Sequence, residues 1–270
     1  MQLVELQRIL PELERAGYAL FAVSYDPVAV LAEFADRHSI VFPMLADEGS
    51  RVIDEVGVLD RDLAAHHEAM GTATRDDQQG VAYPVTFAIG SDGRVEGKTV
   101  EENYRLRDNG RRLVERLTGV STPVAGVERE TRRGVLHAQL QLDGSTYFTY
   151  QRQDLHVGLT VAPDWHVYGP VVPAGYTPLR VAIASKPSGV QAGNVDWPET
   201  TSLVIAGLEE RFEVYRSRVD LVVPLDMIVR RGTGDLLLDV RIDFQACNEI
   251  KCLPPSTLIM SMAVPEAPVP

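Results

Sequence analysis

The chain has 270 residues, of which 45% are hydrophobic and 24% charged, proportions typical of a folded, soluble protein with one or two domains. Its formal net charge of −12 argues against a surface that binds nucleic acid or anionic membranes. No apolar run approaches the roughly 20 residues that span a bilayer, and the amphipathic start at Met1–Glu5 is unlike a signal peptide.

The first 120 residues alternate between helical and strand patterns. Apolar spacing and capping residues predict helices at residues 2–16, 26–38, 48–56 and 109–117. Strand-like runs lie between them at residues 18–24, 42–46, 85–89 and 94–100. Residues 59–80 are polar and predict irregular structure. Because helices and strands alternate, we expect a largely parallel sheet covered by helices.

The second half changes character after a linker that we place at residues 121–131. From there to residue 264, short β-rich runs are separated by proline and glycine, without helical stretches. The expected strands are residues 134–142, 148–150, 155–161, 179–184, 203–206, 218–223, 236–244 and 257–263. Residues 132–264 therefore predict an antiparallel β-sandwich.

The chain has only two cysteines, Cys247 and Cys252, between the last two predicted strands. Two thiols at the tip of a hairpin can close as a disulfide or open as a dithiol, which makes a reversible pair a redox centre. A disulfide closing so short a loop stabilises by only about 2 kcal/mol in the chain-entropy treatment, which favours chemistry over stapling. A zinc site is disfavoured, because the spacing is not Cys-x-x-Cys and the six histidines are scattered.

Five segments of the second half form a recognisable pattern: Pro163–Gly169 with its Trp-His-x-Tyr sequence, Thr177–Leu179, Val195–Pro198, Val214–Pro224 and Phe244–Pro255. In this order they resemble the N-terminal periplasmic domain of the thiol:disulfide interchange protein DsbD. The resemblance implies an immunoglobulin-like sandwich in which Cys247 and Cys252 cycle between disulfide and dithiol. It also implies a relay of electrons from a membrane partner to substrate proteins, and a periplasmic or other extracytoplasmic compartment.

The first half resembles the redoxin branch of the thioredoxin superfamily, near the alkyl hydroperoxide reductases, over residues 19–26, 42–47 and 83–93. Pro84 stands where thioredoxin-like folds keep a cis-proline beside the active site, and where strict peroxiredoxins usually carry an arginine. Members of this group place a strand and then a reactive cysteine before the first long helix, but residues 1–246 hold no cysteine. We therefore expect that the first strand and its cysteine are missing, and that residues 1–120 are poorly stable.

Together these features predict an α/β thioredoxin-like domain (residues 1–120) followed by an all-β immunoglobulin-like sandwich (residues 132–264). The predicted function is thiol–disulfide exchange through Cys247 and Cys252, with a thioredoxin-like protein or a DsbD-type membrane carrier as partner. No bound cofactor or metal is expected, because the electrons reside on sulfur. One alternative is a non-catalytic binding or scaffold module with a structural disulfide, and another is a peroxiredoxin-type antioxidant enzyme in a full-length form.

Four further residues have two possible roles. For Trp165, His166 and Tyr168, the residues alone favour packing in the core or at a strand edge, and the alternative is a site that shields the cysteines or meets a partner. Pro84 would support the active site in an intact redoxin, whereas in this chain a structural role is favoured.

Overall fold

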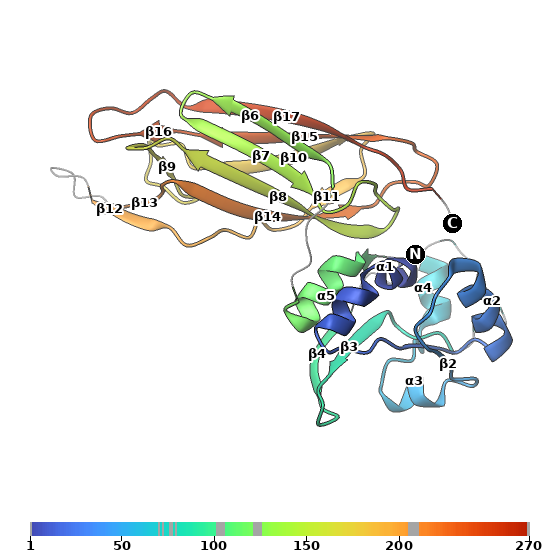
Figure 1. The fold of residues 1–270 in the computed structure, drawn as a ribbon. Coiled ribbons are helices and arrows are strands. Elements are labelled where there is room, and N and C mark those ends of the chain that lie inside the picture. Colours follow the sequence, from blue (N-terminus) through green and yellow to red (C-terminus); the bar gives the residue numbers. More distant parts are fainter. Residues whose placement is uncertain are drawn as a thin grey trace. The chain divides into compact units, whose positions relative to one another are not determined.

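The computed structural model describes residues 2–69, 71, 73–75, 78, 80–100, 106–120, 126–204 and 211–268. The chain divides into two compact units, residues 1–122 with residue 270, and residues 123–269 (Figure 1). Each unit is described by itself. Within the described ranges, no helix is both long and apolar enough to cross a membrane.

The N-terminal unit mixes helices and strands, as the sequence predicts. Its elements are α1 (Gln2–Arg15), β1 (Ala22–Ser24), α2 (Val28–His38), β2 (Met44–Ala46), α3 (Arg51–Glu55), α4 (Leu63–Ala69), β3 (Val85–Ile89), β4 (Val95–Val100), β5 (Arg107–Asp108) and α5 (Gly110–Thr118). Helix α4 lies in the stretch that we expected to be irregular. It forms there because Leu63 and His67, one helical turn apart, are both buried.

The strands of this unit form two separate pairs. Strand β1 pairs with β2 in parallel, and β3 pairs with β4 as the expected antiparallel hairpin. No pairing joins β1 to β3 in the described part of the unit, so the expected parallel sheet is present only as the β1–β2 pair. The middle strand that the redoxin resemblance places between β1 and β3 stays a prediction.

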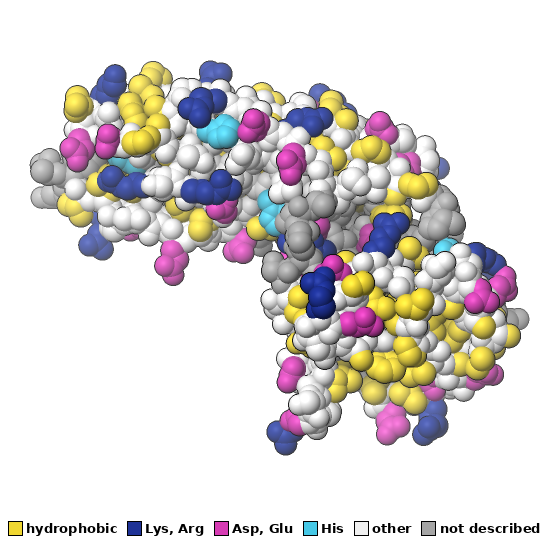
Figure 2. All heavy atoms as spheres, viewed as in Figure 1, with side chains coloured by type: hydrophobic (Ala, Val, Ile, Leu, Met, Phe, Trp, Pro, Cys, Tyr) yellow, Lys and Arg dark blue, Asp and Glu magenta, His cyan; other side chains and the backbone are white. Residues whose placement is uncertain are grey.

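Only one face of the β1–β2 pair is covered. Ala22 and Met44 pack against a core built mainly from α1 and α5, whose buried residues are Leu6, Leu10, Leu13, Ile40, Phe42, Leu113 and Val114. On the other face Val23 lies opposite Leu45, and the two side chains are 51% and 49% exposed. Figure 2 shows hydrophobic side chains gathered on the visible face of this unit. Parallel strands are usually covered on both faces, so this exposed apolar surface is unusual.

The C-terminal unit is rich in strands. They are β6 (Glu128–Arg133), β7 (Leu136–Leu142), β8 (Gln151–Val161), β9 (His166–Tyr168), β10 (Arg180–Lys186), β11 (Val190–Ala192), β12 (Thr201–Val204), β13 (Arg211–Tyr215), β14 (Arg218–Met227), β15 (Leu236–Phe244), β16 (Ala246–Cys247) and β17 (Ser256–Val264). They form sheets in the orders β11-β14-β8-β7-β6, β10-β15-β17 and β12-β13-β9-β16. Within these three orders, neighbouring strands in the described residues pair antiparallel.

The first two of these sheets share one large core. Alternate residues of β7, β8 and β14 are buried together with alternate residues of β15 and β17, which is the pattern of two sheets packed face to face. Strand β6 takes up residues 128–131 of the segment that we assigned to a linker, because those residues pair with β7. Residues 121–125 of that segment, and residues 205–206 of an expected strand, lie outside the described residues. Residues 148–150, also expected as a strand, form a turn before β8.

We expect the N-terminal unit to unfold at a lower temperature than the C-terminal unit, because its core is much smaller and one sheet face is uncovered. Calorimetry should resolve two transitions. Both tryptophans, Trp165 and Trp197, lie in the C-terminal unit, so tryptophan fluorescence should follow the upper transition only. Leu113→Ala, at a buried site of α5, should lower the unfolding free energy of the N-terminal unit by about 2–5 kcal/mol. Only the lower of the two transitions should therefore move to a lower temperature. A fluorescence change at the lower transition would contradict the prediction that the N-terminal unit unfolds first.

Candidate functional site

Strands β15 and β17 form a long hairpin that carries both cysteines in its connection. They pair from Leu236 opposite Val264 to Phe244 opposite Ser256, so the connection begins at the end of a continuous ladder. Cys247 and Cys252 are bonded in a disulfide with a Cα–Cα distance of 4.0 Å. The expected hairpin and the disulfide form of the pair are therefore both present in the structure.

The loop between the two cysteines is held by its own hydrogen bonds. The Asn248 side-chain oxygen accepts from the backbone N–H groups of Ile250 (2.9 Å) and Lys251 (2.8 Å), and the Asn248 N–H donates to the Lys251 carbonyl (2.9 Å). Asparagine favours this kind of turn because its side chain reaches backbone groups two residues on. Outside the disulfide, the Leu253 N–H donates to the Ala246 carbonyl at 2.8 Å. The loop is thus a closed turn.

The two sulfurs differ in their exposure to solvent. Cys247 lies in β16, which pairs with β9, and is only 1% exposed. Cys252 lies beyond the turn and is exposed. Cys252 is therefore the cysteine that is more accessible to another molecule, whereas Cys247 lies in the protein interior.

Aromatic side chains surround the buried sulfur. Cys247 packs with Tyr168, Phe212 and Val214, and the Tyr176 ring closes the group at 5.1 Å from the Tyr168 ring and 4.8 Å from the Phe212 ring. The Tyr168 hydroxyl lies 3.3 Å from the Cys247 sulfur and 3.8 Å from the Cys252 sulfur. Burial, with the neighbouring Tyr176 in second place, raises the pKa of Tyr168 to about 12. This hydroxyl therefore keeps its proton at neutral pH.

His166 is the cross-strand neighbour of Cys247. The two residues pair directly between β9 and β16, and the His166 and Tyr168 rings lie 5.8 Å apart. His166 is buried, and its Nε2 has no hydrogen-bond partner in the described part of the chain. Burial, and then the nearby positive charge of Arg216, lowers the pKa of His166. The imidazole is therefore held in its neutral form.

The structure separates the other two candidate residues from the disulfide cluster. Trp165 is half-buried and packs against the core shared by the two large sheets. Pro84 lies in the other unit, at the entry to β3. The redoxin resemblance places a cis-proline at Pro84, and this expectation is wrong. The Tyr83–Pro84 bond is not cis, and the cis peptide bond among the described residues is Lys186–Pro187. The Tyr83 N–H donates to the Val58 carbonyl at 2.7 Å, which leads the chain into β3 in an extended form that suits a trans bond.

Three residues that shape the site are missed by the sequence reasoning. Phe212 alternates with Val214 along β13, a two-residue period that could have marked both as buried. Tyr176 lies in a loop and gives no periodic signal. Gln245 links the loop to its surroundings, since its side chain accepts from the Thr177 N–H (3.0 Å) and donates to the Leu253 carbonyl (3.2 Å).

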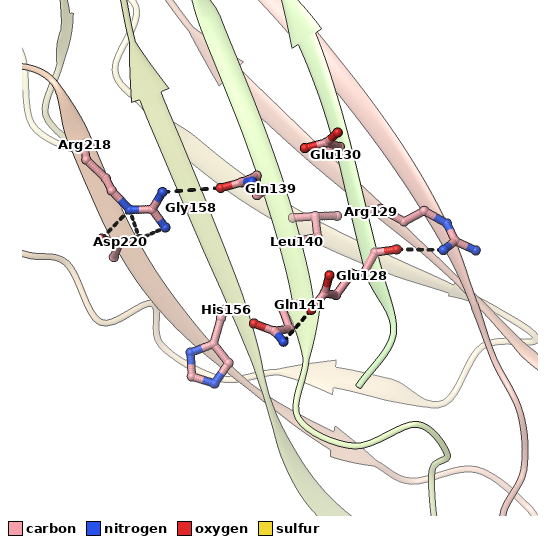
Figure 3. Close-up of a pocket in the computed structure, with 10 residues that line it drawn as sticks. All are labelled: Glu128, Arg129, Glu130, Gln139, Leu140, Gln141, His156, Gly158, Arg218 and Asp220. Atoms are coloured by element: carbon pink, nitrogen blue, oxygen red, sulfur yellow. Dashed lines mark hydrogen bonds and ion pairs between the residues drawn. The ribbon is translucent and has the colours of Figure 1, made fainter. Parts of the chain in front are cut away.

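Neither a metal cluster in the described residues nor a hollow on the C-terminal unit involves the cysteines. No group of three or more histidine, cysteine or acidic residues in the described ranges is arranged to hold a metal ion. A hollow of about 420 Å³ lies on the outer face of β6, β7, β8 and β14 (Figure 3). Several of its polar side chains form hydrogen bonds with each other: Arg218 donates to Asp220, and Gln141 donates to Glu128. It contains none of the candidate residues.

Two protein families match separate segments of the chain. Residues 1–98 match the AhpC/TSA family, and residues 137–263 match the N-terminal region of the thiol:disulfide interchange protein DsbD. No curated protein gave a match.

Solved structures share only a distant likeness with the chain. The N-terminal periplasmic domain of ScsB from Proteus mirabilis is 11% identical, with a TM-score of 0.37 and 52% of each chain covered, so this chain spans about half of that protein's length. The reduced DsbD N-terminal domain of Neisseria meningitidis is 14% identical, with a TM-score of 0.29 and coverage of 41% of this chain and 77% of that one. The GAE domain of yeast GGA1 is 9% identical, with a TM-score of 0.29 and coverage of 50% and 98%. The family models thus match two separate segments of the chain, AhpC/TSA in the first half and DsbD N-terminal in the second.

Proposed function

We propose that this protein exchanges thiols and disulfides through Cys247 and Cys252, and relays electrons between two thiol-redox partners. The observation that carries the proposal is the asymmetric disulfide, with one exposed and one buried sulfur, on a closed loop of the segment that matches DsbD. An exposed sulfur gives a partner access, while a buried sulfur retains the leaving group inside the protein. The architecture we propose is a thioredoxin-like unit followed by an immunoglobulin-like sandwich.

The exchange proceeds in two displacement steps. A thiolate of a dithiol partner attacks the Cys252 sulfur, forms a mixed disulfide and breaks the Cys247–Cys252 bond, whose electron pair leaves on Cys247. Cys247 then takes a proton. The second thiolate of the partner attacks the partner's own sulfur in the mixed disulfide and releases Cys252. The partner has become a disulfide, and this chain has gained two electrons and two protons, which it passes to a second disulfide by the reverse steps.

Tyr168 is suited to support the leaving sulfur. A thiolate buried among Tyr168, Phe212 and Val214 is disfavoured by the loss of water. The Tyr168 hydroxyl, 3.3 Å away and protonated at neutral pH, can donate a hydrogen bond to it. We therefore assign Tyr168 the role of stabilising the reduced form of Cys247, while Trp165 has a packing role.

The N-terminal unit contributes no thiol of its own, because both cysteines lie in the other unit. Its match to AhpC/TSA favours an origin in peroxide or disulfide reduction. In this chain we assign it an accessory role, such as contact with a redox partner. The partners that the DsbD match favours are thioredoxin-like proteins or a DsbD-type membrane carrier, in an extracytoplasmic compartment.

The proposal predicts a disulfide that physiological partners can reduce. Equilibration of the full chain with glutathione or dithiothreitol buffers should give a reduction potential above about −300 mV, whereas structural disulfides typically lie below that value. Cys247→Ser should accumulate a mixed disulfide when it is offered the disulfide form of a thiol-redox protein, because the exposed Cys252 thiolate attacks that bond and the partner's other sulfur leaves as a thiolate. Cys252→Ser should trap far less, because its remaining thiol, Cys247, is buried.

A potential well below about −300 mV would instead favour a static clip in a non-catalytic binding or scaffold module. Peroxide consumption that survives both Cys247→Ser and Cys252→Ser would favour the antioxidant alternative and show that the site lies elsewhere. Equal trapping by the two single variants would contradict the assignment of Cys252 as the attacked sulfur.

Tyr168→Phe should make the reduced form less stable and lower the reduction potential. A hydrogen bond contributes about 1 kcal/mol net, and 30 mV corresponds to about 1.4 kcal/mol for two electrons, so we expect a shift of roughly 20 mV. The pKa of the Cys247 thiol in the reduced protein should rise. Tyr215→Phe is a matched control, because the Tyr215 hydroxyl is bonded to the Pro198 carbonyl and not to the cysteines. A potential that Tyr168→Phe leaves unchanged would remove Tyr168 from the mechanism.

His166 should make the C-terminal unit less stable in mild acid. Its pKa is lowered in the folded state, so as pH falls through about 6.5 the unfolded chain binds a proton that the folded protein does not. His166→Phe should therefore lose less unfolding free energy between pH 7.5 and pH 5 than the unmodified protein, measured by urea unfolding with tryptophan fluorescence. His137→Phe, on β7, controls for the loss of an imidazole as such. An identical pH dependence in His166→Phe would contradict the prediction.

A further inference from the structure

We propose that Ile250 is a docking anchor for the redox partner, and that it inserts into an apolar recess beside the partner's reactive cysteine. The inference rests on the proposed thiol–disulfide exchange and specifies the surface that the partner must present. It concerns recognition, since Ile250 has no group that could take part in the chemistry.

Ile250 is exposed to an unusual degree and is held in place. Its side chain is 91% exposed, the highest value among the large hydrophobic residues found exposed. The bonds from Asn248 fix its backbone, and the disulfide closes the loop on both sides. Because the backbone of the turn is already fixed, binding has to order only the side-chain torsions of Ile250, so its burial contributes more fully to affinity.

The chemistry of the exchange places a partner over this side chain. The mixed disulfide is a covalent bond of about 2 Å between a partner sulfur and the Cys252 sulfur. Ile250 lies two residues before Cys252 in the same tight turn. A folded partner that makes this bond therefore brings its surface close to the turn that carries Ile250. An apolar recess accommodates the side chain and removes it from water.

The surroundings of Ile250 favour an apolar contact over an electrostatic one. Its neighbours Glu249 and Lys251 are exposed and opposite in charge, so the turn presents no net charge of one sign. A second exposed apolar residue, Val171, is 79% exposed three residues after β9. The next residue, Val172, packs against the cluster around Cys247. Buried apolar anchors near the centre of a contact carry much of the binding energy in protein interfaces.

The test compares reduction of the disulfide in the full chain by a protein dithiol and by a small one. The probes are reduced thioredoxin, a folded protein with a surface dithiol, and dithiothreitol. Thiols freed over time are trapped with a maleimide and counted by mass. Ile250→Ser should lower the second-order rate constant with thioredoxin about tenfold or more, as expected for the loss of one buried isoleucine. Its rate with dithiothreitol should change less than twofold.

Two control variants separate the anchor from general effects. Ile250→Leu, which keeps the apolar contact, should retain most of the rate with thioredoxin. Ile259→Ser removes the same side chain from β17, where it is 63% exposed, and should leave both rates unchanged. A thermal melt of each variant checks that the C-terminal unit stays folded.

The outcomes distinguish this inference from the function on which it rests. If the unmodified disulfide resists both probes, the proposed exchange itself fails. If thioredoxin reduces the unmodified protein and Ile250→Ser equally fast, the exchange stands and the anchor is refuted. An equal loss with both probes would show that Ile250 acts by shaping the loop, which also refutes the anchor. A dimer that Ile250→Ser abolishes would assign the side chain to self-association instead.

Discussion

The pairing of β15 with β17 determines where both sulfurs lie. All nine residues of β15 pair with β17, and alternate residues from Leu236 to Phe244 are buried in the core. A shift of one residue would turn that whole row toward solvent, so the burial of apolar area sets the register. The connection between the strands must therefore begin and end at defined positions. The cysteines meet because the hairpin is anchored in the sandwich, and the disulfide adds little to that anchoring.

The short β9–β16 pairing then makes the two sulfurs unequal. It places Cys247 opposite His166 and 3.3 Å from the Tyr168 hydroxyl, whereas Cys252, beyond the turn, lies 3.8 Å from that hydroxyl and is exposed. His166 is held neutral by its burial. The environment of the buried sulfur is therefore governed by desolvation, which opposes a thiolate, and by one hydroxyl donor, which favours it. Accessibility and the aromatic environment are therefore divided between the two cysteines.

The alternation of apolar and polar residues predicts those strands that bury every second side chain. Alternation along residues 236–244 predicts β15 with its observed bounds, and the position of the cysteines at a hairpin tip allows the disulfide that the structure contains. Strand β9 lacks such a signal, because its three residues are all buried and show no alternation. Tyr176 and Phe212 reach the cluster only through the pairing of distant strands. The exposure of each sulfur depends on the same tertiary contacts. The expected cis bond at Pro84 came from family resemblance alone, and the local backbone does not adopt it.

The two units differ in how their cores relate to redox chemistry. The C-terminal unit buries its apolar residues in one shared core, and that core fixes the position of the cysteine hairpin. The N-terminal unit matches a redox family, yet it holds no cysteine and leaves Val23 and Leu45 exposed on one face of β1–β2. Fold and chemistry are therefore separable in this chain, as they are across many shared folds. Within these 270 residues, electrons can be carried on sulfur only by Cys247 and Cys252, so any contribution of the N-terminal unit to redox exchange must be made through binding.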